Sequence, residues 1–427
     1  MKRTYTKEVK QGKCFVEGFV QDVRDLSKIK FLVLRDITGI VQITAHKDKT
    51  KKEVFDLITK IPRESVITVE GKAVKSKQAP GGREIILEKI SLLAKAAEKL
   101  PIDLSPFSKT ELPKRLDWRP LDLHNRKVQA IFKIESEITA AFRSFWKDRG
   151  FIEINTPCII SSASEGGTEL FPVMYFEKPA FLAQSPQLYK QMCVTALEKV
   201  FTIVPVWRAE PSHTVRHVTE ARQMDIEVAF SDEFDVMDLL TKVVAYIVKQ
   251  VKTKCKEELK SLGKELKIPK AKYLSYTDTI KLLKKNKIKV EQGEDIPPEG
   301  EKKLSEIYPN TIIFTYDWPL SLKPFYIMPK DEKADAKLSE GFDAIYGGIE
   351  ISSGGQRVHI PELLIKRLKA NKLDPKKFDY YINSFKYGAP RHAGWSIGLE
   401  RFTMALLGLE NIREATLFPR DVERLVP

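Results

Sequence analysis

Short runs of alternating apolar and polar residues fill the first hundred positions. Five of them, "KCFVEGFVQDV", "KIKFLVLRD", "GIVQITAH", "SVITVEGKAVK" and "REIILEKISLLA", are separated by turn signals such as "DITG" and "APGG". Alternation with a period of two is the pattern of a half-buried strand. With the helical run "KKEVFDLITKI" after the third strand, these runs predict a small OB-type β-barrel over residues 1–100. Such barrels bind single-stranded nucleic acid, although the pattern also fits a barrel that serves as a protein-interaction module.

The pattern changes after residue 100. Residues 101–125 contain four prolines, which is typical of an extended hinge. Residues 126–150 have apolar positions at helical spacing and end directly before the strand-like "FIEINTP". Helical spacing returns at 235–262 and 360–370, and strand-like runs lie between these segments. We therefore expect residues 126–427 to form one large α+β domain, a mostly antiparallel sheet flanked by helices.

A dense cluster of both charges lies between two apolar runs in "VWRAEPSHTVRHVTEARQMDIEVAF". If strands 200–208 and 223–230 form a hairpin, alternation puts Arg208 and Glu210 on one face and leaves Arg216 and His217 at the loop tip. Guanidinium groups bind phosphate oxygens bidentately, and carboxylates bind amino groups or Mg²⁺. The cluster therefore predicts a nucleoside triphosphate site, although a salt-bridged surface hairpin would have the same pattern.

Four further stretches place polar residues in apolar surroundings. The sequence has no GxxxxGK[ST] loop, no GxGxxG after a strand and no GxSxG elbow, so a triphosphate would be held by arginines. The stretches are "SEGGTELF" with Glu165, "AQSPQLYKQM" with Ser185, Gln187 and Lys190, "FDAIYGGIEISSGGQRVH" with Asp343, Glu350, Ser353 and Arg357, and "GWSIGLERF" with Glu400 and Arg401 at the start of an apolar helix.

The composition narrows the class of protein. Of the 427 residues, 42% are hydrophobic and 30% are charged, as in soluble globular proteins, and no apolar run is long enough to span a membrane. The N-terminus lacks the apolar core of a signal peptide, so we expect a cytoplasmic protein. Four scattered cysteines argue against a disulfide framework and against a zinc site. The net charge of +14 favours a polyanionic partner, although the lysine-rich segment 251–289 also fits a peripheral insertion with a solvated basic face.

Three stretches, "FIEINTP", "FTIVPVWRAE…RHVTEARQMDIE" and "SIGLERF", resemble motifs 1, 2 and 3 of the class II aminoacyl-tRNA synthetases. The details "EGGTELF", "AQSPQLYKQM", "IEISSGGQR" and "NIREATLFPRD" resemble the aspartyl-tRNA synthetases of the archaeal and eukaryotic branch. The resemblance covers nearly the whole chain, including an OB-type anticodon-binding domain and the hinge. It implies an enzyme that uses ATP and Mg²⁺ to activate L-aspartate and transfers it to the 3′ end of the aspartate tRNA.

The resemblance also implies a role for each matching position. The catalytic residues would be Arg208, Arg401 and Glu350. The ATP site would comprise Arg208, Ala209, Glu210, Arg216, His217, Val218, Glu350, Gly398, Leu399, Glu400 and Arg401. The aspartate site would comprise Glu165, Gln187, Leu188, Tyr189, Lys190, Arg208, Ser353 and Arg357. Magnesium would be held by Glu350, Ser353 and Asp343, and the anticodon would meet Phe31, Gln42, Gln21 and Pro80.

Two positions depart from the family pattern. Ala221, followed by Arg222, stands where many relatives have a phenylalanine that stacks on the adenine. Arg391 stands where relatives usually have a second proline before motif 3. The partner of Arg401 on the second face of the adenine and the shape of the loop before motif 3 therefore stay open.

The choice of amino acid and of tRNA depends on a few positions. Lys190 adds a cation that favours aspartate over asparagine, because the two side chains differ in charge and not in shape. The resemblance implies that tRNA choice depends on the positions of Gln21 and Pro80. Strict relatives, which charge only the aspartate tRNA, tend to have Trp and Lys there, and relaxed relatives, which also charge the asparagine tRNA, tend to have His and Pro. Pro80 therefore favours a relaxed enzyme, whose product an amidotransferase would convert, whereas Gln21 fits neither pattern.

Other readings have different consequences. An asparaginyl-tRNA synthetase would share the catalytic motifs, and a tRNA-independent amino-acid-activating paralogue would lack the barrel with Phe31 and Gln42. An inactive nucleic-acid-binding protein would have lost Arg208, Glu350 or Arg401, and all three are present. The helix predicted at 126–148 would form the interface of a homodimer, or else would be an ordinary core helix.

Overall fold

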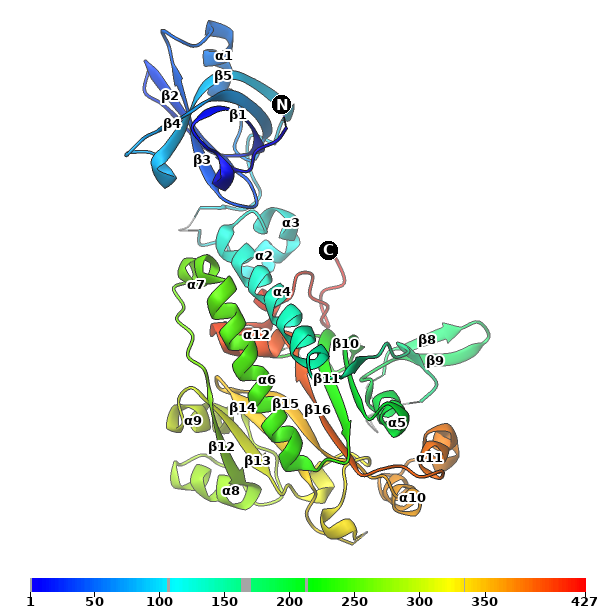
Figure 1. Ribbon diagram of the computed structural model, residues 1–427. Coiled ribbons are helices and arrows are strands. Elements are labelled where there is room, and N and C mark those ends of the chain that lie inside the picture. Colours follow the sequence, from blue (N-terminus) through cyan, green and yellow to red (C-terminus); the bar gives the residue numbers. More distant parts are fainter. Residues whose placement is uncertain (1, 106–107, 163–169, 212–213, 334) are drawn as a thin grey trace. The chain divides into compact units, whose positions relative to one another are not determined.

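Two compact units, residues 1–103 and 104–427, make up the protein (Figure 1). The computed structural model describes residues 2–105, 108–162, 170–211, 214–333 and 335–427. Each unit has a hydrophobic core of its own. The predicted end of the first domain at residue 100 lies close to this division. Residues 101–125 were predicted to be an extended hinge, but Leu112–Asp117 and Arg119–Asp122 form two short helices of the larger unit.

The N-terminal unit is a closed five-stranded barrel, as predicted, with strand order β1-β2-β3-β5-β4. Alternate side chains of each strand point inward, and aliphatic residues such as Val16, Leu34 and Ile67 fill the interior. One α-helix lies between the third and fourth strands. The elements are β1 (Gly12–Asp25), β2 (Ile29–Arg35), β3 (Ile40–His46), α1 (Lys52–Ile58), β4 (Val66–Lys75) and β5 (Arg83–Ala94).

An eight-stranded sheet dominates the larger unit, with strand order β12-β13-β14-β15-β16-β11-β10-β6. The six central strands pair antiparallel, and only the two edge pairs are parallel, so the predicted α+β class is confirmed. The strands are β6 (Ile152–Glu153), β10 (Lys199–Trp207), β11 (Glu220–Ala229), β12 (Lys270–Ser275), β13 (Thr311–Tyr316), β14 (Gly341–Tyr346), β15 (Ile349–Gln356) and β16 (His392–Gly398).

Three helices, α4 (Arg126–Lys147), α6 (Glu233–Lys254) and α12 (Leu399–Leu407), pack on the same hydrophobic core as one face of this sheet (Figure 1). Met224 of β11, Trp395 of β16 and Ala344 of β14 face these helices and are fully buried. Because strand side chains alternate, Asp225 and Ser396 project from the opposite face. The helices therefore leave one face of the central strands for polar chemistry.

The lysine-rich segment is only partly what the pattern indicated. All its lysines are exposed, but residues 270–275 form β12, the parallel edge strand of the main sheet. Helix α8 (Tyr276–Lys285) follows and buries Tyr276, Ile280 and Leu283 in a second core. Because lysines interrupt the apolar positions, the sequence pattern indicated neither β12 nor α8. The helix predicted at 235–262 is likewise divided at Cys255 into α6 and α7 (Lys256–Leu262).

Shorter elements complete the larger unit. A three-stranded sheet of order β7-β9-β8 lies beside the main one, and a third hydrophobic cluster joins α5, α10 and α11. These elements are α2 (Leu112–Asp117), α3 (Arg119–Asp122), β7 (Ile159–Ile160), β8 (Pro172–Tyr175), β9 (Lys178–Leu182), α5 (Gln187–Leu197), α9 (Pro298–Ile307), α10 (Pro361–Ala370) and α11 (Asp379–Phe385).

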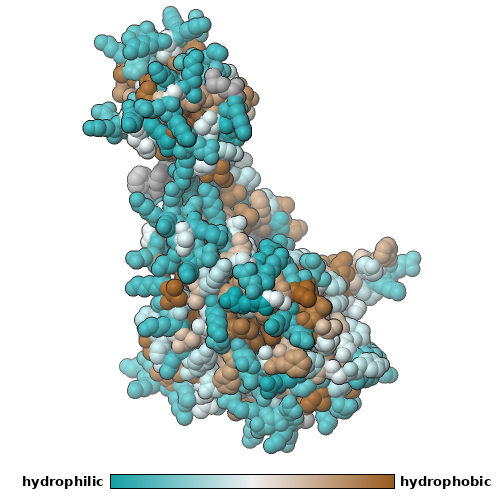
Figure 2. All heavy atoms as spheres, viewed as in Figure 1, coloured by the Kyte–Doolittle hydropathy of each residue, from teal (hydrophilic) through white to brown (hydrophobic). Residues whose placement is uncertain are grey.

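On the face shown in Figure 2, hydrophilic residues dominate both units, with apolar side chains among them. Among the helices of the described residues, none is both long and apolar enough to cross a membrane.

Candidate active site

A cavity of about 370 Å³ opens on the face of the sheet that the helices leave free. Its walls come from the β10–β11 hairpin, the β14–β15 hairpin, the end of β16 with the start of α12, and residues 318–327. Of the residues predicted for the site, the following line it: Gln187, Arg208, Glu210, Arg216, His217, Val218, Asp343, Glu350, Ser353, Arg357, Gly398, Glu400 and Arg401.

The β10–β11 hairpin exists as predicted, but its loop is shorter and begins one residue earlier, at residue 208. β10 ends at Trp207 and β11 begins at Glu220, so Arg208 and Glu210 lie in the loop and not on a strand face. Arg208 Nη1 is 3.8 Å from Glu210 Oε1, and its side chain is 45% exposed, so the guanidinium can still reach a ligand. Burial lowers the pKa of His217, and Arg401, Arg208 and Arg216 lower it further against the effect of Glu210. The loop thus presents a cationic surface with a neutral imidazole.

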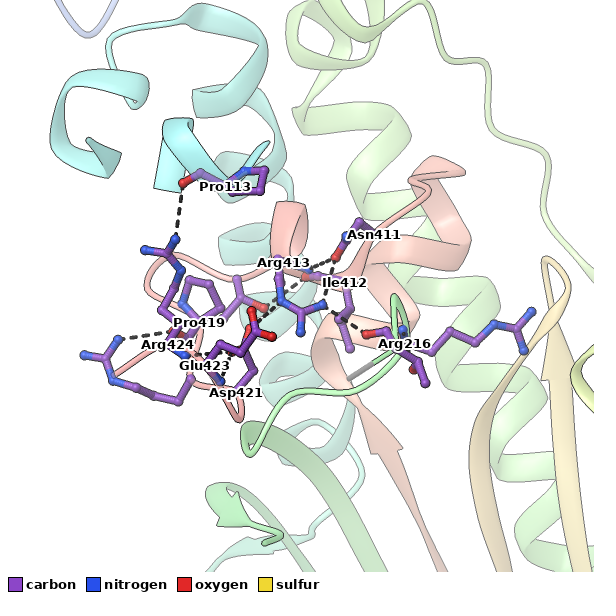
Figure 3. A network of polar contacts seen from close by, with 12 residues as sticks. Pro113, Arg216, Asn411, Ile412, Arg413, Pro419, Asp421, Glu423 and Arg424 are labelled. Carbon is purple, nitrogen blue, oxygen red and sulfur yellow. Dashed lines mark hydrogen bonds and ion pairs between the residues drawn. The ribbon is translucent and has the colours of Figure 1, made fainter. Parts of the chain in front are cut away.

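Contacts from distant segments hold this loop in place. Arg216 donates to Glu301 Oε2 at 2.5 Å and to the carbonyl of Gly348 at 3.1 Å. Arg216 extends away from the cluster that the C-terminal residues form (Figure 3). Burial raises the pKa of Glu301 to about 7, although Arg216 opposes this shift. Arg216 is thereby directed toward the β14–β15 hairpin and the cavity.

The C-terminal segment holds the same loop from the other side. Arg413 Nη1 donates to the carbonyl of Thr214 at 3.0 Å, and Arg413 Nε lies 2.5 Å from Asp421 Oδ2 (Figure 3). Backbone hydrogen bonds join Ile412 N to Val215 O at 2.9 Å and Thr219 N to Arg420 O at 2.7 Å. The resemblance assigned no role to these residues, and only the fold brings them to the loop.

Arg401 and Glu400 open α12, as predicted. Among the described residues, Arg401 has no hydrogen-bond or salt-bridge partner, so its guanidinium is available to a ligand. Glu400 accepts from the backbone N–H of Arg222 at 3.1 and 3.0 Å, and burial raises its pKa to about 7. Gly394 allows β16 to approach its neighbour, because a Cβ there would lie 2.3 Å from Glu227 Oε2.

A group of acidic side chains lies on the β14–β15 hairpin. Asp343 of β14 pairs with Ser353 of β15, and an irregularity after Ala344 brings Glu350 to the same cavity. The hairpin turns at Gly347, whose φ of 62° and lack of room beside the carbonyl of Ala405 both require glycine. Burial and the neighbouring Asp343 raise the pKa of Glu350 to about 7, against Arg401 and Lys323. These groups are hard oxygen donors of the kind that Mg²⁺ prefers.

The β14–β15 hairpin offers few side-chain ligands for a metal ion. The described residues contain no group of three or more His, Cys, Asp and Glu side chains placed to hold a metal. Asp343 is bonded to Lys323, whose Nζ lies 2.7 and 2.6 Å from its two carboxylate oxygens. The donor set of Asp343, Glu350 and Ser353 therefore fits an ion that takes part of its coordination from a bound phosphate.

A buried network of four charges lies beneath one end of the cavity. Lys190 is 1% exposed, with Nζ 2.9 Å from Asp225 Oδ2 and 3.3 Å from Glu227 Oε2. Arg357 Nε lies 2.9 Å from Glu227 Oε1. Burial acts to raise the pKa of Glu227, but Arg357 and Lys190 outweigh it and lower that pKa. Burial raises the pKa of Asp225, against the effect of Lys190.

This network changes the expected position of Lys190. Arg357 and Asp225 line the cavity, whereas the Lys190 ammonium is bonded to Asp225 behind the wall. Direct contact of Lys190 with a bound carboxylate stays a prediction. Gln187 lines the cavity and donates through Nε2 to Gln191 Oε1 at 2.8 Å, so its carbonyl oxygen is left to face a ligand.

Some predicted residues lie elsewhere. In the part of the chain that the structure describes, Ala209, Leu188, Tyr189 and Leu399 do not line the cavity, and Leu188 and Leu399 belong to hydrophobic cores. Glu165 lies outside the described residues. Ala221 and Arg222 both line the cavity at the position where the family pattern is broken. The cavity residues to which sequence reasoning gave no role include Asp295, Trp318, Lys323 and Tyr326.

The signals for these missed residues are weak. Lys323 is the one charge in "PLSLKPFYIM", and a lone lysine before a proline in an apolar run was the available hint. Asp225 was visible in the charge cluster but had no partner within the local sequence.

The residues predicted for the anticodon lie on the barrel. β2 pairs with β3 so that Phe31 faces Thr44 and Val33 faces Gln42, which puts Phe31 and Gln42 on the same outer face. Gln42 Nε2 donates to Glu84 Oε2 at 3.1 Å. Gln21 lies at a bulge in β1, and Pro80 is exposed in the turn before β5. A polar and aromatic surface of this kind suits unstacked bases.

Comparisons with known proteins agree over nearly the whole chain. Residues 111–422 match the family of class II tRNA synthetases (D, K and N), and residues 15–93 match the OB-fold nucleic acid binding domains. A Methanopyrus kandleri protein named aspartate–tRNA(Asp/Asn) ligase is 47% identical over 96% of this chain and 95% of its own. A Pyrococcus horikoshii protein named aspartate–tRNA(Asp) ligase is 46% identical over 99% and 98%.

Solved structures show the same fold. The asparaginyl-tRNA synthetase of Pyrococcus horikoshii in complex with asparaginyl-adenylate has a TM-score of 0.96 at 33% identity and covers all of both chains. The aspartyl-tRNA synthetase of Entamoeba histolytica has a TM-score of 0.87 at 31% identity and covers 100% of this chain and 93% of its own.

Proposed function

Because this chain belongs to the class II tRNA synthetases of the D, K and N group, we propose that it is an aspartate–tRNA ligase. It uses ATP to activate L-aspartate as aspartyl-adenylate and transfers the aspartyl group to the 3′ end of tRNA(Asp). The observation that carries the proposal is the convergence of Arg208, Arg401 and Glu350 on one cavity, from three segments far apart in the sequence.

The first step needs no general base, since the α-carboxylate of aspartate is already an anion. One of its oxygens forms a bond to the α-phosphorus of ATP, and the bond to the β-phosphate bridging oxygen breaks to release pyrophosphate. Arg208 and Arg401 stabilise the charge that builds on the phosphate oxygens, and both hold the reactants in line. Arg216 and His217 line the same cavity and would meet the outer phosphates.

Glu350, Asp343 and Ser353 would hold Mg²⁺, which supplies positive charge to the phosphate oxygens. The fit is supported by the raised pKa of Glu350, about 7, since burial and a neighbouring carboxylate disfavour its charge until a cation arrives. In the second step a terminal ribose hydroxyl of the tRNA attacks the adenylate carbonyl, and AMP leaves.

Selection of aspartate over asparagine is proposed to depend on charge behind the pocket. Arg357 and Lys190 bring two positive charges, and Glu227 cancels one of them. Asp225 is the partner of the other, Lys190, and a ligand carboxylate that meets these two cations is favoured over an amide because its hydrogen bonds are charge-assisted. The relatives named aspartate–tRNA ligases are also more similar to this chain than the asparaginyl-tRNA synthetase of known structure.

ATP–pyrophosphate exchange tests this function. We expect exchange that depends on aspartate, with asparagine at least a hundredfold less effective, because a buried charged site rejects the uncharged isostere. Exchange that ran faster with asparagine would overturn the assignment and favour an asparaginyl-tRNA synthetase. Exchange without charging of any tRNA would favour a tRNA-independent paralogue.

A second activity, charging of tRNA(Asn), is favoured by Pro80 at the exposed turn of the barrel. Aspartyl-tRNA(Asn) would then need an amidotransferase as partner. Charging assays on both transcripts test this, and activity confined to tRNA(Asp) would contradict it. We further propose that the protein forms a homodimer along α4. Elution at the mass of one chain in a sizing experiment would contradict the dimer. We also propose a cytoplasmic location.

A further inference from the structure

Lys323 lines the cavity, yet the family motifs assign no role to it. It follows a short 3₁₀ turn (Leu320–Leu322) and is only 8% exposed. Its ammonium lies 2.7 Å from Oδ1 and 2.6 Å from Oδ2 of Asp343, so it is shared by both carboxylate oxygens. A lysine in this position neutralises the carboxylate that is expected to meet Mg²⁺.

A tryptophan holds the ammonium from the other side. The Nζ of Lys323 lies 4.3 Å from the centre of the Trp318 ring, a cation–π contact. Trp318 is 1% exposed, and its Nε1 donates to the carbonyl of Thr315 at 2.9 Å. These contacts direct the lysine stem into the cavity, where its ammonium bonds the Asp343 carboxylate.

The charges around Lys323 are mostly negative. Asp343 of β14, Glu350 of β15 and Asp295 before α9 all line the same cavity, and Arg401 of α12 lies opposite. Burial and Asp343 raise the pKa of Asp295, and Lys323 acts against this rise, as it does at Glu350. In the ligand-free protein Lys323 supplies positive charge where a divalent cation would otherwise be needed.

We propose that Lys323 is a phosphate-binding residue that bonds Asp343 in the nucleotide-free enzyme and exchanges this contact for a phosphate oxygen when ATP enters with Mg²⁺. The inference rests on the proposed function. An ammonium and a divalent cation at one carboxylate repel each other, so occupation of Asp343 by metal displaces Lys323. The flexible four-carbon stem and three donors of lysine suit such an exchange, and lysine binds phosphate as a point charge.

Two measurements on the Lys323→Met variant test the exchange, since methionine keeps the length of the stem without its charge. The first is Mn²⁺ binding to the nucleotide-free protein at pH 8, read from the electron paramagnetic resonance signal of free Mn²⁺. The second is calorimetric ATP binding at a Mn²⁺ concentration that saturates both proteins, so that the metal has released Lys323 in the wild type. We expect Mn²⁺ alone to bind about tenfold more tightly to the variant, because a competing cation is lost, and ATP to bind about tenfold more weakly to its metal-saturated form, because a phosphate contact is lost.

The control is Lys330→Met, which removes a lysine paired with Asp317 outside the cavity and should change neither affinity. Lys323→Arg keeps the charge and should leave Mn²⁺ affinity close to that of the wild type. It also gives a folded comparison if Lys323→Met unfolds in a thermal scan; a tenfold gain in Mn²⁺ affinity by this charge-conserving variant would overturn the inference.

A merely structural role for Lys323 has a different result. Mn²⁺ and ATP affinities would then fall together in Lys323→Met, or both would stay at the wild-type value, and either result overturns the inference. Failure of the proposed function is separate, because it is seen in the wild type as the absence of aspartate-dependent pyrophosphate exchange.

Discussion

Arg401 shows most directly how one residue is prepared for ligand binding. Its guanidinium lines the cavity at the first turn of α12 and has no hydrogen-bond or salt-bridge partner among the described residues. Arg357, in contrast, bonds Glu227 through Nε and Nη2. A side chain without protein partners adds little to the stability of the fold, so its presence in the cavity is explained by a ligand.

Replacement of Arg401 should separate activity from stability. In Arg401→Lys we expect the rate of ATP–pyrophosphate exchange to fall about 10²-fold, because lysine cannot make the planar, bidentate contacts of a guanidinium. The thermal midpoint should stay near that of the wild type. Arg391→Lys, an exposed arginine outside the cavity, is the matched control and should exchange normally. A large loss of stability in Arg401→Lys would contradict this explanation.

Glu350 should make the stability of the ligand-free protein depend on pH, with a sign that follows from its raised pKa. Burial raises its pKa from the ordinary 4.5 to about 7 in the folded state, so the folded protein holds this proton where the unfolded chain has lost it. The contribution of Glu350 to the stability of the fold is therefore complete below about pH 4.5 and is lost as the pH rises through about 7.

Thermal scans of the wild type and Glu350→Gln between pH 5 and 8 measure this contribution. The midpoint of the wild type should fall relative to that of the variant as the pH rises, since glutamine cannot ionise. Parallel pH profiles for the two proteins would show that the Glu350 pKa is not raised. At pH 6 the wild type should also release protons when ATP and Mg²⁺ bind, because ionised Glu350 is the binding form.

At the scale of elements, the loop between β10 and β11 is held by a segment that follows it by two hundred positions. Arg413 bonds the carbonyl of Thr214, and Asp421 orients Arg413 (Figure 3). The loop carries Arg208. A loop that is already held in place need not be ordered when a triphosphate binds, so these contacts favour binding.

Arg413→Met should raise the KM for ATP about tenfold, because a charge-assisted hydrogen bond to the loop is lost and the loop must be ordered on binding. The KM for aspartate should change less, since Gln187 and Arg357 come from other elements. Arg424→Met removes contacts to Pro113 and Asp117 and none to the loop, so it is the matched control. Equal rises of both KM values in Arg413→Met would indicate general loss of structure instead.

At the scale of the whole molecule, the cavity and the residues predicted to meet the anticodon belong to two different units with separate cores. The barrel keeps its apolar side chains inside and presents Phe31 and Gln42, while the larger unit contains every described residue of the cavity. We therefore expect activation of aspartate to need only the larger unit, and tRNA selection to need both units.

A chain of residues 104–427 should retain aspartate-dependent ATP–pyrophosphate exchange, because its core is formed without the barrel. Its charging of tRNA should fall at least a hundredfold, since the anticodon contacts are gone. Charging by the full chain should weaken steeply with added salt, as expected for binding to phosphates, whereas exchange should change little. A truncated chain that charged tRNA as well as the full one would contradict this division.

Local patterns in the sequence were sufficient for much of this protein. Alternation predicted the barrel and the β10–β11 hairpin, and helical spacing predicted α4 and α12. The resemblance of short motifs to a known family singled out Arg208, Glu350 and Arg401, and all three line the cavity. These features depend on residues near one another in the chain, where strand and helix periods act directly.

Contacts between distant segments were decided only by the tertiary structure. Glu350 and Ser353, three positions apart, would face opposite sides of a regular strand, and the irregularity in β15 brings both to the cavity. The bond of Lys323 to Asp343, the burial of Lys190 behind Asp225 and the hold of Arg413 on Thr214 join residues from separate elements. No local period encodes such pairs, because they arise when the sheet brings its strands together and removes their charges from water.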